Sequence, residues 1–497
     1  MEELLLVRAD AGAAIGSGHV MRCLALAQAW QDAGGSALRA SATESPVADA
    51  RYEGEGIATI RISAEPGSAA DAGQTVALAR ERAAAWVVVD GYRFGADYQK
   101  AVKDAGLRQL YVDDYGQADH YFADVVLNQN PYADASVYAS RERHTELLLG
   151  LRYALLRREF YSRVGFDRQI PSAARRLLVT MGGGETGSVI DKVLDALRML
   201  GNKDLEAVVL VGGRQVADAQ AGRLAFPVRF ERDVADMPGL MAWADLAISG
   251  AGSTCWELAF MGLPAMLVVL AENQRPVAES VQQAGAGVNL GEQEAVTAES
   301  IARAVEELLP AGERRLAMSQ AGRGLVDGRG AERVVRHMKA AMLSLRPVRE
   351  DDCRLIWQWA NEPELRAMSF LSEAIPWEDH VKWFRSKLAD RNCIFRVAEL
   401  AGQPVGQVRF DCEANRATIS IGLDKAFRGR GLGSQLIRLA SRELFGKTDA
   451  TVIHAYIKPE NAASVGAFTG AGFSHRRETD RKGQKAILLL LHRDEMA

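Results

Sequence analysis

The sequence predicts an α/β protein with two consecutive doubly wound halves, followed by a smaller α+β domain. Three observations predict it. Short apolar runs alternate with helix-like stretches as far as Met342, a glycine-rich loop follows a predicted strand in each half, and the pattern changes near Leu345. A chain of 497 residues has room for such an arrangement, since a typical domain takes ~100 to 200 residues.

The first two parts are each expected to contain a buried parallel sheet. Apolar, β-branched runs bounded by turn residues alternate with helical segments, which favours parallel strands covered by helices on both faces. In the first half the strands are expected at residues 4–7, 86–89, 109–112 and 125–127. After Pro171 they are expected at 176–181, 207–211, 246–249 and 265–269, with a helix at 188–200.

The last part is predicted to be a mixed α+β unit. A strand at 345–348 precedes a helix that contains Trp357 and Trp359. Further strands are expected at 395–399, 405–410, 418–423 and 452–457, with a helix ending near Phe445. We therefore expect domains at 1–155, 156–342 and 343–497.

Composition excludes several classes of protein. Hydrophobic residues make up 48% and charged residues 25%, as in ordinary soluble proteins. A net charge of -4 gives no attraction to nucleic acid or acidic membranes. The longest apolar runs, such as 487–491, are far shorter than the ~20 residues that span a bilayer, and no basic segment of a secretory signal begins the chain. We expect a cytoplasmic protein with no membrane span and no nucleic-acid partner.

No protein-bound metal is expected. The five cysteines form no Cys-x-x-Cys pair, and the eight histidines have no ligand spacing. Asp113-Asp114 could be a metal-binding pair, as in sugar transferases that use manganese. A structural role is favoured, because adjacent residues at a strand end point in different directions and helix N-termini can neutralise phosphates.

The first candidate site follows the first strand. Gly16 and Gly18 let a ligand approach the backbone, and the helix that begins near His19 offers free N–H groups and the positive end of its dipole to an anion. A dinucleotide fingerprint would need a third glycine where Met21 stands, which disfavours NAD. Histidine has a reference pKa of ~6.5 and can exchange protons near neutral pH. The plain alternative is a helix-start histidine bonded to its own loop.

The second half contains a stronger signature. The loop 250–254 lies between a strand and a helix whose first turn carries Glu257. Its N–H groups can hold a diphosphate while the carboxylate accepts hydrogen bonds from a ribose diol. A first-turn Glu also complements a helix dipole without any ligand. A third loop, 181–184, would face the same cleft, because ligands of open α/β sheets bind beyond the carboxyl ends of the strands.

Residues 1 to about 300 resemble the UDP-sugar hydrolases of pseudaminic acid biosynthesis, which are relatives of GT-B glycosyltransferases. The resemblance rests on ordered matches at Arg8-Ala9-Asp10, Ile15-Gly16-x-Gly18-His19-x-x-Arg22, Asp90-Gly91-Tyr92, Val112-Asp113-Asp114, Leu127-Asn128-x-Asn130, Tyr153-Ala154-Leu155-Leu156-Arg157 to Tyr161, Met181-Gly182-Gly183 and Glu272-Asn273-Gln274. It implies metal-free hydrolysis of UDP-2,4-diacetamido-2,4,6-trideoxy-β-L-altropyranose to UDP and the free sugar.

The resemblance also assigns roles to residues. His19 would be the base that activates water, with Tyr92 and Asn273 near the sugar. The substrate would be bound by Gly16, Gly18, Arg22, Gly182, Gly183, Gly250, Gly252, Ser253, Thr254 and Glu257.

Residues 345 to 497 resemble the GNAT family of acetyl-CoA-dependent N-acetyltransferases. The matches are Arg428-Gly429-Arg430-Gly431-Leu432-Gly433-Ser434, then Asn461-x-x-Ser464 and Gly470-x-Gly472-Phe473. The successive N–H groups of such a turn form an anion nest. The resemblance implies acetyl-CoA as co-substrate, bound by Ile421, Leu423, Arg428, Gly429, Gly431, Gly433, Ser434, Asn461 and Ser464.

One position departs from the GNAT pattern. Many members carry a tyrosine four residues after the serine, as the acid for the leaving thiolate, and here that position is Phe468. Phenylalanine cannot donate a proton. Either the thiolate leaves without help, or His454 or Tyr456 substitutes; an ordinary strand role for these two residues is favoured.

Together the two resemblances predict a bifunctional enzyme of the GT-B and GNAT classes. The GNAT domain would acetylate the 4-amine of a UDP-4-amino-4,6-dideoxy-N-acetyl-altrosamine, and the front half would hydrolyse the product to UDP. Alternatives are a legionaminic-type sugar, a true glycosyltransferase in the front half, or a protein amine as acetyl acceptor. Self-association into a homo-oligomer is left open.

Overall fold

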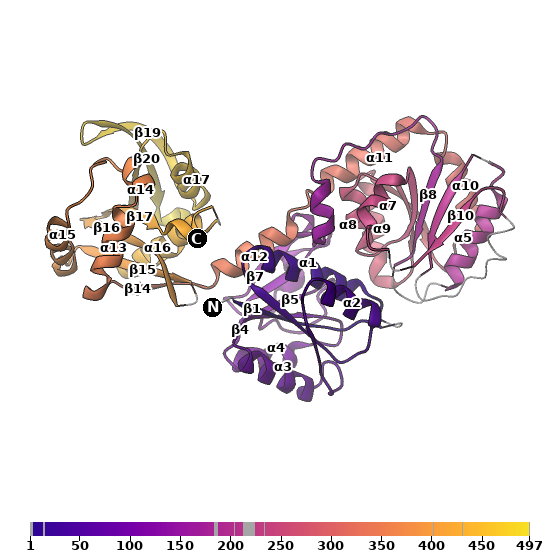
Figure 1. Cartoon of the computed structure of the whole chain (residues 1–497), viewed down its shortest axis with the longest axis horizontal. Helices are drawn as coiled ribbons and strands as arrows, with labels where there is room; N and C mark the ends of the chain where they lie inside the picture. Colours follow the sequence, from indigo (N-terminus) through magenta and orange to yellow (C-terminus); the bar gives the residue numbers. More distant parts are fainter. Residues whose placement is uncertain are drawn as a thin grey trace. The chain divides into compact units, whose positions relative to one another are not determined.

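The computed structural model describes residues 3–12, 15–182, 187–202, 204–211, 224–232, 234–400, 402–429 and 431–496. It divides into two compact units, residues 1–335 and 336–497 (Figure 1). The division falls inside helix α12 (Gly330–Ala340). Among the predicted site residues, Gly183 lies outside the described residues.

The first sheet has seven strands, all parallel, in the order β3-β2-β1-β4-β5-β6-β7. The strands are β1 (Leu4–Ala9), β2 (Ser36–Ser41), β3 (Thr59–Arg61), β4 (Ala84–Asp90), β5 (Gln109–Val112), β6 (Val125–Asn128) and β7 (Glu146–Leu149). Helices α1 (Gly18–Asp32) and α2 (Pro46–Gly54) lie on one side of it, and α3 (Ala69–Glu81) and α4 (Ala96–Asp104) on the other (Figure 1).

Strand β2 is an element that hydropathy did not predict. Its sequence, Ser-Ala-Leu-Arg-Ala-Ser, includes a fully buried arginine, Arg39. The guanidinium of Arg39 lies over the ring of Tyr52 and forms an ion pair with Asp49 at 2.8 Å. A buried cation needs such partners. Here they come from helix α2, so the sequence of β2 alone does not show that the strand is buried.

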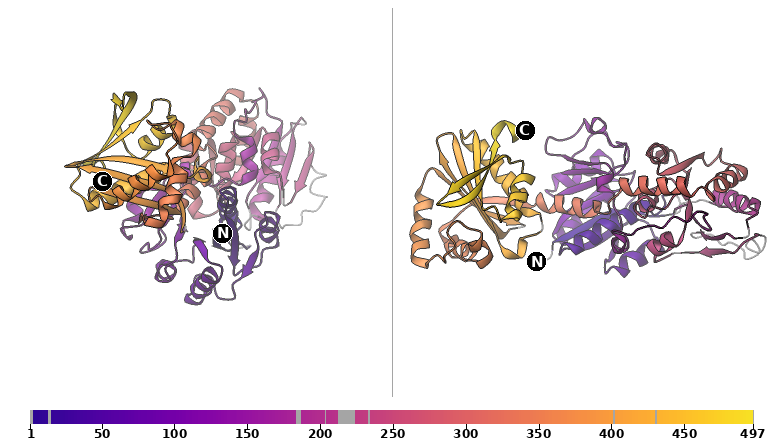
Figure 2. Two further views of the ribbon diagram at one scale, coloured as in Figure 1. Left: turned by 60° about the vertical axis from the view of Figure 1, so that its left-hand side comes forward. Right: turned by 90° about the horizontal axis from the view of Figure 1, so that it is seen from above.

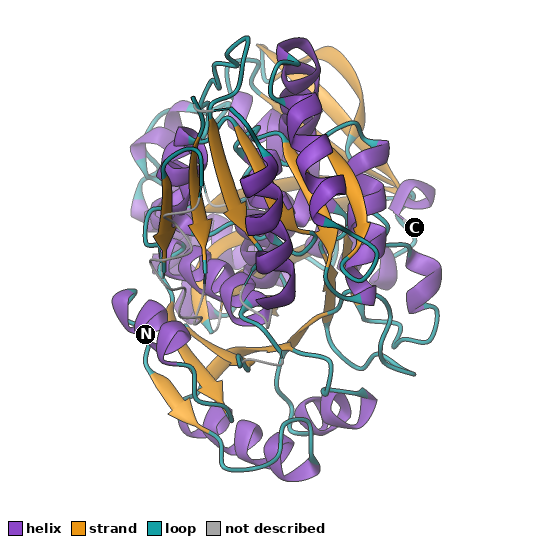
Figure 3. Cartoon of the chain, turned by 90° about the vertical axis from the view of Figure 1, so that its right-hand side faces the viewer, coloured by secondary structure: helices purple, strands orange, loops and turns teal. Residues whose placement is uncertain are grey.

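The second sheet has six parallel strands in the order β10-β9-β8-β11-β12-β13. They are β8 (Arg176–Thr180), β9 (Glu206–Leu210), β10 (Val228–Glu231), β11 (Leu246–Gly250), β12 (Ala265–Val269) and β13 (Gly287–Glu292). The covering helices are α5 (Gly187–Met199), α7 (Met237–Trp243), α8 (Thr254–Phe260), α9 (Arg275–Gln283), α10 (Ala298–Leu308) and α11 (Gly312–Leu325). Figure 3 shows helices on both faces of this sheet.

The third sheet has seven strands in the order β14-β15-β16-β17-β18-β20-β19, and only the pair β17 and β18 is parallel. The strands are β14 (Leu343–Pro347), β15 (Cys393–Leu400), β16 (Gln403–Glu413), β17 (Arg416–Leu423), β18 (Val452–Ile457), β19 (Ser474–Arg481) and β20 (Gln484–His492). The helices are α13 (Cys353–Ala360), α14 (Pro363–Ala367), α15 (Trp377–Ala389), α16 (Leu432–Lys447) and α17 (Ala462–Gly470). Figure 2 shows these elements in orange to yellow.

Two parallel sheets followed by a mixed sheet confirm the predicted fold class. No helix in the described part of the chain is long and apolar enough to cross a membrane.

Candidate functional site

The loop after β1 positions His19 at the start of helix α1. Gly16 has a φ of 75°, a left-handed conformation that favours glycine, and Gly18 is the first residue of the helix. A Cβ atom built on Gly18 would lie 3.8 Å from the hydroxyl oxygen of Ser253. The glycine loops of the two halves therefore lie close together, as the position of ligand sites in α/β sheets predicts.

His19 is held by a buried carboxylate from the neighbouring strand. Its Nδ1 lies 2.7 Å from Oδ1 of Asp90, the last residue of β4, and the side chain of Asp90 is completely buried. A carboxylate can only accept a hydrogen bond, so Nδ1 carries the proton. The lone pair of Nε2 is then free, and no described residue hydrogen-bonds to that atom. This is the tautomer that a general base needs.

Arg22, one turn further along α1, lies between two carboxylates. Its guanidinium binds Asp90 at 2.6 Å and Asp114 at 2.7 Å, and all three side chains are at least nine-tenths buried. Burial alone would raise the pKa of Asp90, but the charge of Arg22 and the hydrogen bonds from Arg22 and His19 outweigh it and hold that pKa well below its usual range. The pKa of Asp114 is lowered in the same way, mainly by Arg22. Both carboxylates are therefore charged at neutral pH.

Tyr92 connects the two halves of this unit. Its hydroxyl group donates to Oδ2 of Asp114 at 3.0 Å and accepts from Nδ2 of Asn273 at 2.7 Å. The edge of the ring meets His19, with 4.6 Å between the ring centroids. Burial and Asp114 raise the pKa of Tyr92, so the phenol stays neutral and can donate. The structure thus brings together His19, Tyr92 and Asn273, the three residues predicted to be catalytic.

Asp113 and Asp114 point to different partners. Oδ1 of Asp113 accepts from the backbone N–H groups of Tyr115 and Gly116, both at 2.7 Å, while Asp114 binds Arg22 and Tyr92. Among the described residues, no group of three or more His, Cys, Asp and Glu side chains is arranged to hold a metal ion.

The second half contributes the loop between β11 and α8. A Cβ atom on Gly250 would lie 2.7 Å from Cδ1 of Leu270 and 3.0 Å from the carbonyl oxygen of Met181, so glycine favours the close approach of the 250–254 loop to the loop after β8. Gly182, in that neighbouring loop, has a φ of 82°. Helix α8 begins at Thr254, and the N–H groups of Cys255 and Trp256 donate to the loop carbonyl oxygens of Gly252 and Ser253, at 3.0 and 3.1 Å. The adjoining helix end and loops are suited to bind an anion.

Glu257, on the first turn of α8, is paired with an arginine from the connecting segment. Oε1 of Glu257 lies 3.0 Å from the guanidinium of Arg157. Burial raises the pKa of Glu257, and Arg157 opposes that shift. Oε2 of Glu257 has no hydrogen-bond partner among the described residues, so it can still accept hydrogen bonds from a diol.

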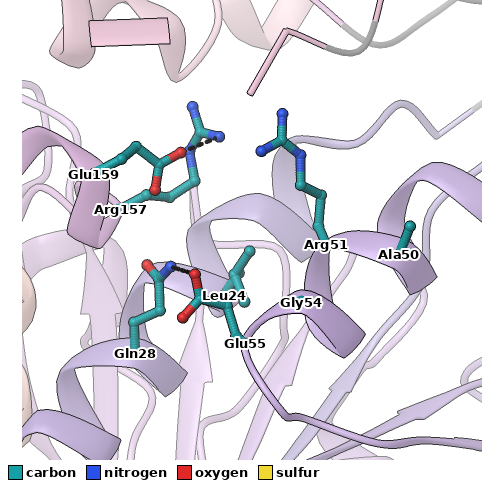
Figure 4. Close-up of a pocket in the computed structure, with 8 residues that line it drawn as sticks. All are labelled: Leu24, Gln28, Ala50, Arg51, Gly54, Glu55, Arg157 and Glu159. Atoms are coloured by element: carbon teal, nitrogen blue, oxygen red, sulfur yellow. Dashed lines mark hydrogen bonds and ion pairs between the residues drawn. The ribbon is translucent and has the colours of Figure 1, made fainter. Parts of the chain in front are cut away.

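Arg157 also lines a cleft of about 220 Å³ (Figure 4). The cleft is bounded by Leu24, Gln28, Ala50, Arg51, Gly54, Glu55, Arg157 and Glu159, from α1, α2 and the connecting segment. Figure 4 shows Arg157 bonded to Glu159, at 2.8 Å, and Gln28 bonded to Glu55, at 2.9 Å. Arg157 therefore contacts both this cleft and Glu257, which is not among the residues that line the cleft.

The second candidate site lies at the N-terminus of α16. Gly429 and Gly431 both have a φ of 76°, which L side chains rarely adopt. Gly431 caps the helix, and Gly433 and Ser434 are in its first turn, where N–H groups lack partners within the helix. This turn can bind an anion such as a pyrophosphate.

Two of the predicted coenzyme A ligands already have partners within the unit. The guanidinium of Arg428 donates to the carbonyl oxygen of Leu423 at 3.0 Å and pairs with Glu362 at 2.6 Å. The side chain of Asn461 caps α17 by accepting from the N–H of Ser464 at 3.0 Å. To bind a pyrophosphate, Arg428 would have to exchange Glu362 for it.

The parallel strands β17 and β18 pair at only three positions. The register runs from Arg416 opposite Val452 to Thr418 opposite His454, and then the strands part. Ile421 and Leu423 therefore pair with β16 on one side, and their other backbone edge has no strand partner in the described part of the unit. That open edge can bind an extended ligand such as pantetheine. Phe468 is buried against Phe473, with ring centroids 5.0 Å apart, so its ring is part of the core.

Three side chains of the first site had no predicted catalytic or binding role. Asp90, Asp114 and Arg157 lie in the motifs that carry the resemblance, but local sequence does not say what they contact. Asp90 and His19 are 71 residues apart. They meet because β1 and β4 are neighbours, with Ala9 opposite Asp90.

Two family models match parts of the chain. Residues 176–333 match the glycosyltransferase family 28 C-terminal domain, and residues 342–474 match the acetyltransferase (GNAT) domain. Each covers less than half of the 497 residues.

Three relatives are similar to this chain. An uncharacterized protein of Methanocaldococcus jannaschii is 21% identical and matches 79% of this chain and 82% of its own length. The spore coat polysaccharide biosynthesis protein SpsG of Bacillus subtilis is 28% identical over 45% of this chain and 67% of its own. The UDP-2,4-diacetamido-2,4,6-trideoxy-beta-L-altropyranose hydrolase of Campylobacter jejuni is 30% identical over 33% of this chain, and the match spans 56% of that hydrolase.

Two solved structures resemble separate parts of the molecule. MurG of Acinetobacter baumannii is 18% identical, with a TM-score of 0.47, over 68% of this chain and 99% of MurG. The aminoglycoside acetyltransferase AAC(6′)-Ib, solved with ribostamycin and coenzyme A, is 21% identical, with a TM-score of 0.29, over 31% of this chain and 94% of its own. The chain thus joins two parallel α/β sheets, the second of which matches the glycosyltransferase family 28 C-terminal domain, to a mixed-sheet unit that matches the acetyltransferase (GNAT) domain.

Proposed function

We propose that this chain catalyses two consecutive reactions on a UDP-amino sugar. The GNAT domain transfers acetyl from acetyl-CoA to the 4-amine of UDP-4-amino-4,6-dideoxy-N-acetyl-β-L-altrosamine. The GT-B-like part then hydrolyses the resulting UDP-2,4-diacetamido-2,4,6-trideoxy-β-L-altropyranose to UDP and the free sugar. Both steps belong to pseudaminic acid biosynthesis, in the cytoplasm.

One observation carries the hydrolytic half of the proposal: Nδ1 of His19 is held by Asp90 at 2.7 Å, beside glycine loops from both halves. Nε2 accepts a proton from water, whose oxygen forms the new bond to the anomeric carbon as the bond to the diphosphate breaks. The N–H groups at the starts of α1 and α8 stabilise the departing diphosphate. Tyr92 and Asn273 contact the sugar at the same place.

The acetyl-transfer half is supported by the match to the GNAT domain and by the geometry around α16. Acetyl-CoA supplies an activated thioester. The chain binds its pyrophosphate with the Gly429 to Ser434 turn, and binds its pantetheine arm along the open edge of β17. An acceptor amine then attacks the thioester carbon directly.

The order of the two steps follows from the chemistry of the substrate. The relative from Campylobacter jejuni is named for a sugar with two acetamido groups. If the present chain acts on the same sugar, an N-acetyl transfer must precede hydrolysis. A GNAT domain in the same polypeptide supplies that reaction.

The test is a mass-spectrometric assay of the purified full chain with UDP-4-amino-4,6-dideoxy-N-acetyl-β-L-altrosamine, with and without acetyl-CoA. We expect UDP and the free diacetamido sugar only when acetyl-CoA is present. If neither acetylated nucleotide nor free sugar forms, the proposed sugar is wrong. If the acetylated nucleotide accumulates and releases no sugar without an added acceptor, the GT-B-like part is a glycosyltransferase.

A further inference from the structure

Strand β18 carries a histidine at the point where it parts from β17. The last paired position is Thr418 opposite His454. Beyond it, both strands continue without pairing to each other, β17 to Leu423 and β18 to Ile457. A pantetheine arm that binds along the open edge of β17 from the α16 turn would end near this junction. His454 is therefore placed where the thioester would lie.

The side chain of His454 lies on the more accessible face of the sheet. Along β18, His454 and Tyr456 alternate with buried Ile453, Ala455 and Ile457. By register, the face of His454 also includes Ser420 of β17 and Arg409 of β16. The guanidinium of Arg409 lies over the ring of Trp383 on α15, so α15 covers part of this face near β16. His454 itself is partly exposed, so an acceptor can reach its side chain on this face.

The surroundings of His454 keep its imidazole uncharged. Burial lowers the pKa of His454, and the positive charges of Arg416, His492 and Arg477 lower it further. Nδ1 is buried and has no hydrogen-bond partner among the described residues. A neutral imidazole without a fixed partner can accept a proton.

The carboxylates of Asp411 and Glu413, which lie near this face, already pair with cations. Asp411 of β16 binds Lys387 of α15 at 2.8 Å and Arg409 at 3.1 Å. Glu413 pairs with Arg416 at the end of the sheet. On β19, the guanidinium of Arg481 lies 4.2 Å from the ring centroid of Tyr456. The face around His454 and Tyr456 is thus basic.

We propose that His454 is the general base of acetyl transfer and that it compensates for the absence of a tyrosine at Phe468. The proposal rests on the acetyl-transfer activity proposed above. It also narrows the acceptor: a basic face favours an amine that carries negative charge, such as a nucleotide sugar, and disfavours a polycationic amine.

The proton balance of the step is as follows. The imidazole takes one proton from the acceptor ammonium and releases it to solvent. The neutral nitrogen attacks the thioester carbon, a C–N bond forms, and the C–S bond breaks. The imidazole carries a second proton from that nitrogen to the departing sulfur, which leaves as the coenzyme A thiol. One histidine therefore performs both proton transfers.

The kinetic test uses His454→Gln, which keeps a polar side chain of similar size but cannot act as a base. We expect kcat for acetyl transfer to fall by ~10²- to 10⁴-fold, with KM for acetyl-CoA unchanged. The loss should shrink as the pH rises toward the pKa of the amine, because more acceptor then arrives neutral. Tyr456→Phe is the matched control on the same face and should stay within about threefold of the wild type. An equal loss in Tyr456→Phe, or a pH-independent loss in His454→Gln, would overturn the proposal.

A second test does not require the acceptor to be known. The imidazole signals of the full chain are recorded by NMR and assigned to His454 by their absence in His454→Gln. Acetyl-CoA should shift them, whereas adenosine 3′,5′-diphosphate, which lacks the pantetheine arm, should not. An unmoved signal in protein saturated with acetyl-CoA would refute the placement of His454. Failure of the amino-sugar assay combined with a shifted signal would refute only the proposed sugar.

Discussion

The two units use histidine in opposite environments. His19 is buried against a carboxylate that fixes its tautomer, and that carboxylate is held by Arg22. Nδ1 of His454 is buried with no hydrogen-bond partner among the described residues, and the positive charges of Arg416, His492 and Arg477 lower its pKa. The first environment orients an imidazole, and the second keeps one uncharged.

The difference matches the two proposed substrates. A water molecule has no charge and few contacts, so the base that activates it must itself be held in place. An ammonium group is bound through the rest of its nucleotide sugar, so the base only has to be neutral at the working pH. Substitution of a neighbour of His19 or of His454 should therefore affect only the reaction of that histidine.

The largest effect is expected from Asp90→Asn. An asparagine amide can turn its NH₂ group toward Nδ1 and stabilise the wrong tautomer of His19, so we expect UDP release to fall by ~10²- to 10⁴-fold. Acetyl transfer should be unchanged. Hydrolysis is measured with the acetylated nucleotide as substrate. Asp71→Asn is the control, because Asp71 is a buried partner of Arg8 and has no contact with His19; retention of activity in Asp90→Asn would contradict the role of Asp90.

Arg22→Met should mainly affect stability. Removal of the arginine leaves the charges of Asp90 and Asp114 buried without their cation, at a cost of about 3–5 kcal/mol in the free energy of unfolding. Without Arg22, burial raises the pKa of both carboxyls above the unfolded values, so they bind protons more tightly in the folded state. The variant should therefore lose more stability at pH 8 than at pH 5. Urea denaturation at the two pH values checks this, and an equal loss at both would show that the charges are not the cause.

The pH dependence of acetyl transfer should report the pKa of His454. The pKa of His454 is lowered below its usual value of ~6.5. Acetyl transfer limited by this base should stay constant as the pH falls to about 6.5 and decline only below that, approaching tenfold per pH unit. Arg477→Gln removes one of the cations that lower this pKa, so the decline should begin at a higher pH. Profiles of kcat/KM for acetyl-CoA at saturating acceptor test this, and an unmoved profile would exclude Arg477 as a cause.

The smallest effect is expected from Tyr92→Phe. It removes the hydroxyl group that donates to Asp114 and accepts from Asn273, at about 0.5–1.5 kcal/mol per hydrogen bond. We expect kcat/KM for hydrolysis to fall by roughly tenfold. Phe94→Leu is a control in the same segment, because Phe94 is buried in the core. A loss as large as that of Asp90→Asn would mean that Tyr92 takes part directly in proton transfer.

Much of the architecture could be predicted from the sequence. Apolar runs such as 86–89 and 246–249 predicted central strands, and β4 and β11 contain them. The weaker strands β2 and β3 could not be predicted, because β2 buries an arginine and β3 has only three residues. The boundary between the two units could not be predicted either. It falls after Val335, inside the continuous helix α12, where the composition does not resemble that of a linker.

The sequence by itself determined the glycine loops, the position of His19 at the start of a helix, and the type of each domain. These features depend on residues close together in the chain. Only the tertiary structure decided that Asp90 holds His19, that Asn273 reaches Tyr92 across 181 residues, and that His454 lies where β17 and β18 part. Those contacts depend on the order and register of strands in a sheet, which are set by the packing of the whole domain and not by any local pattern.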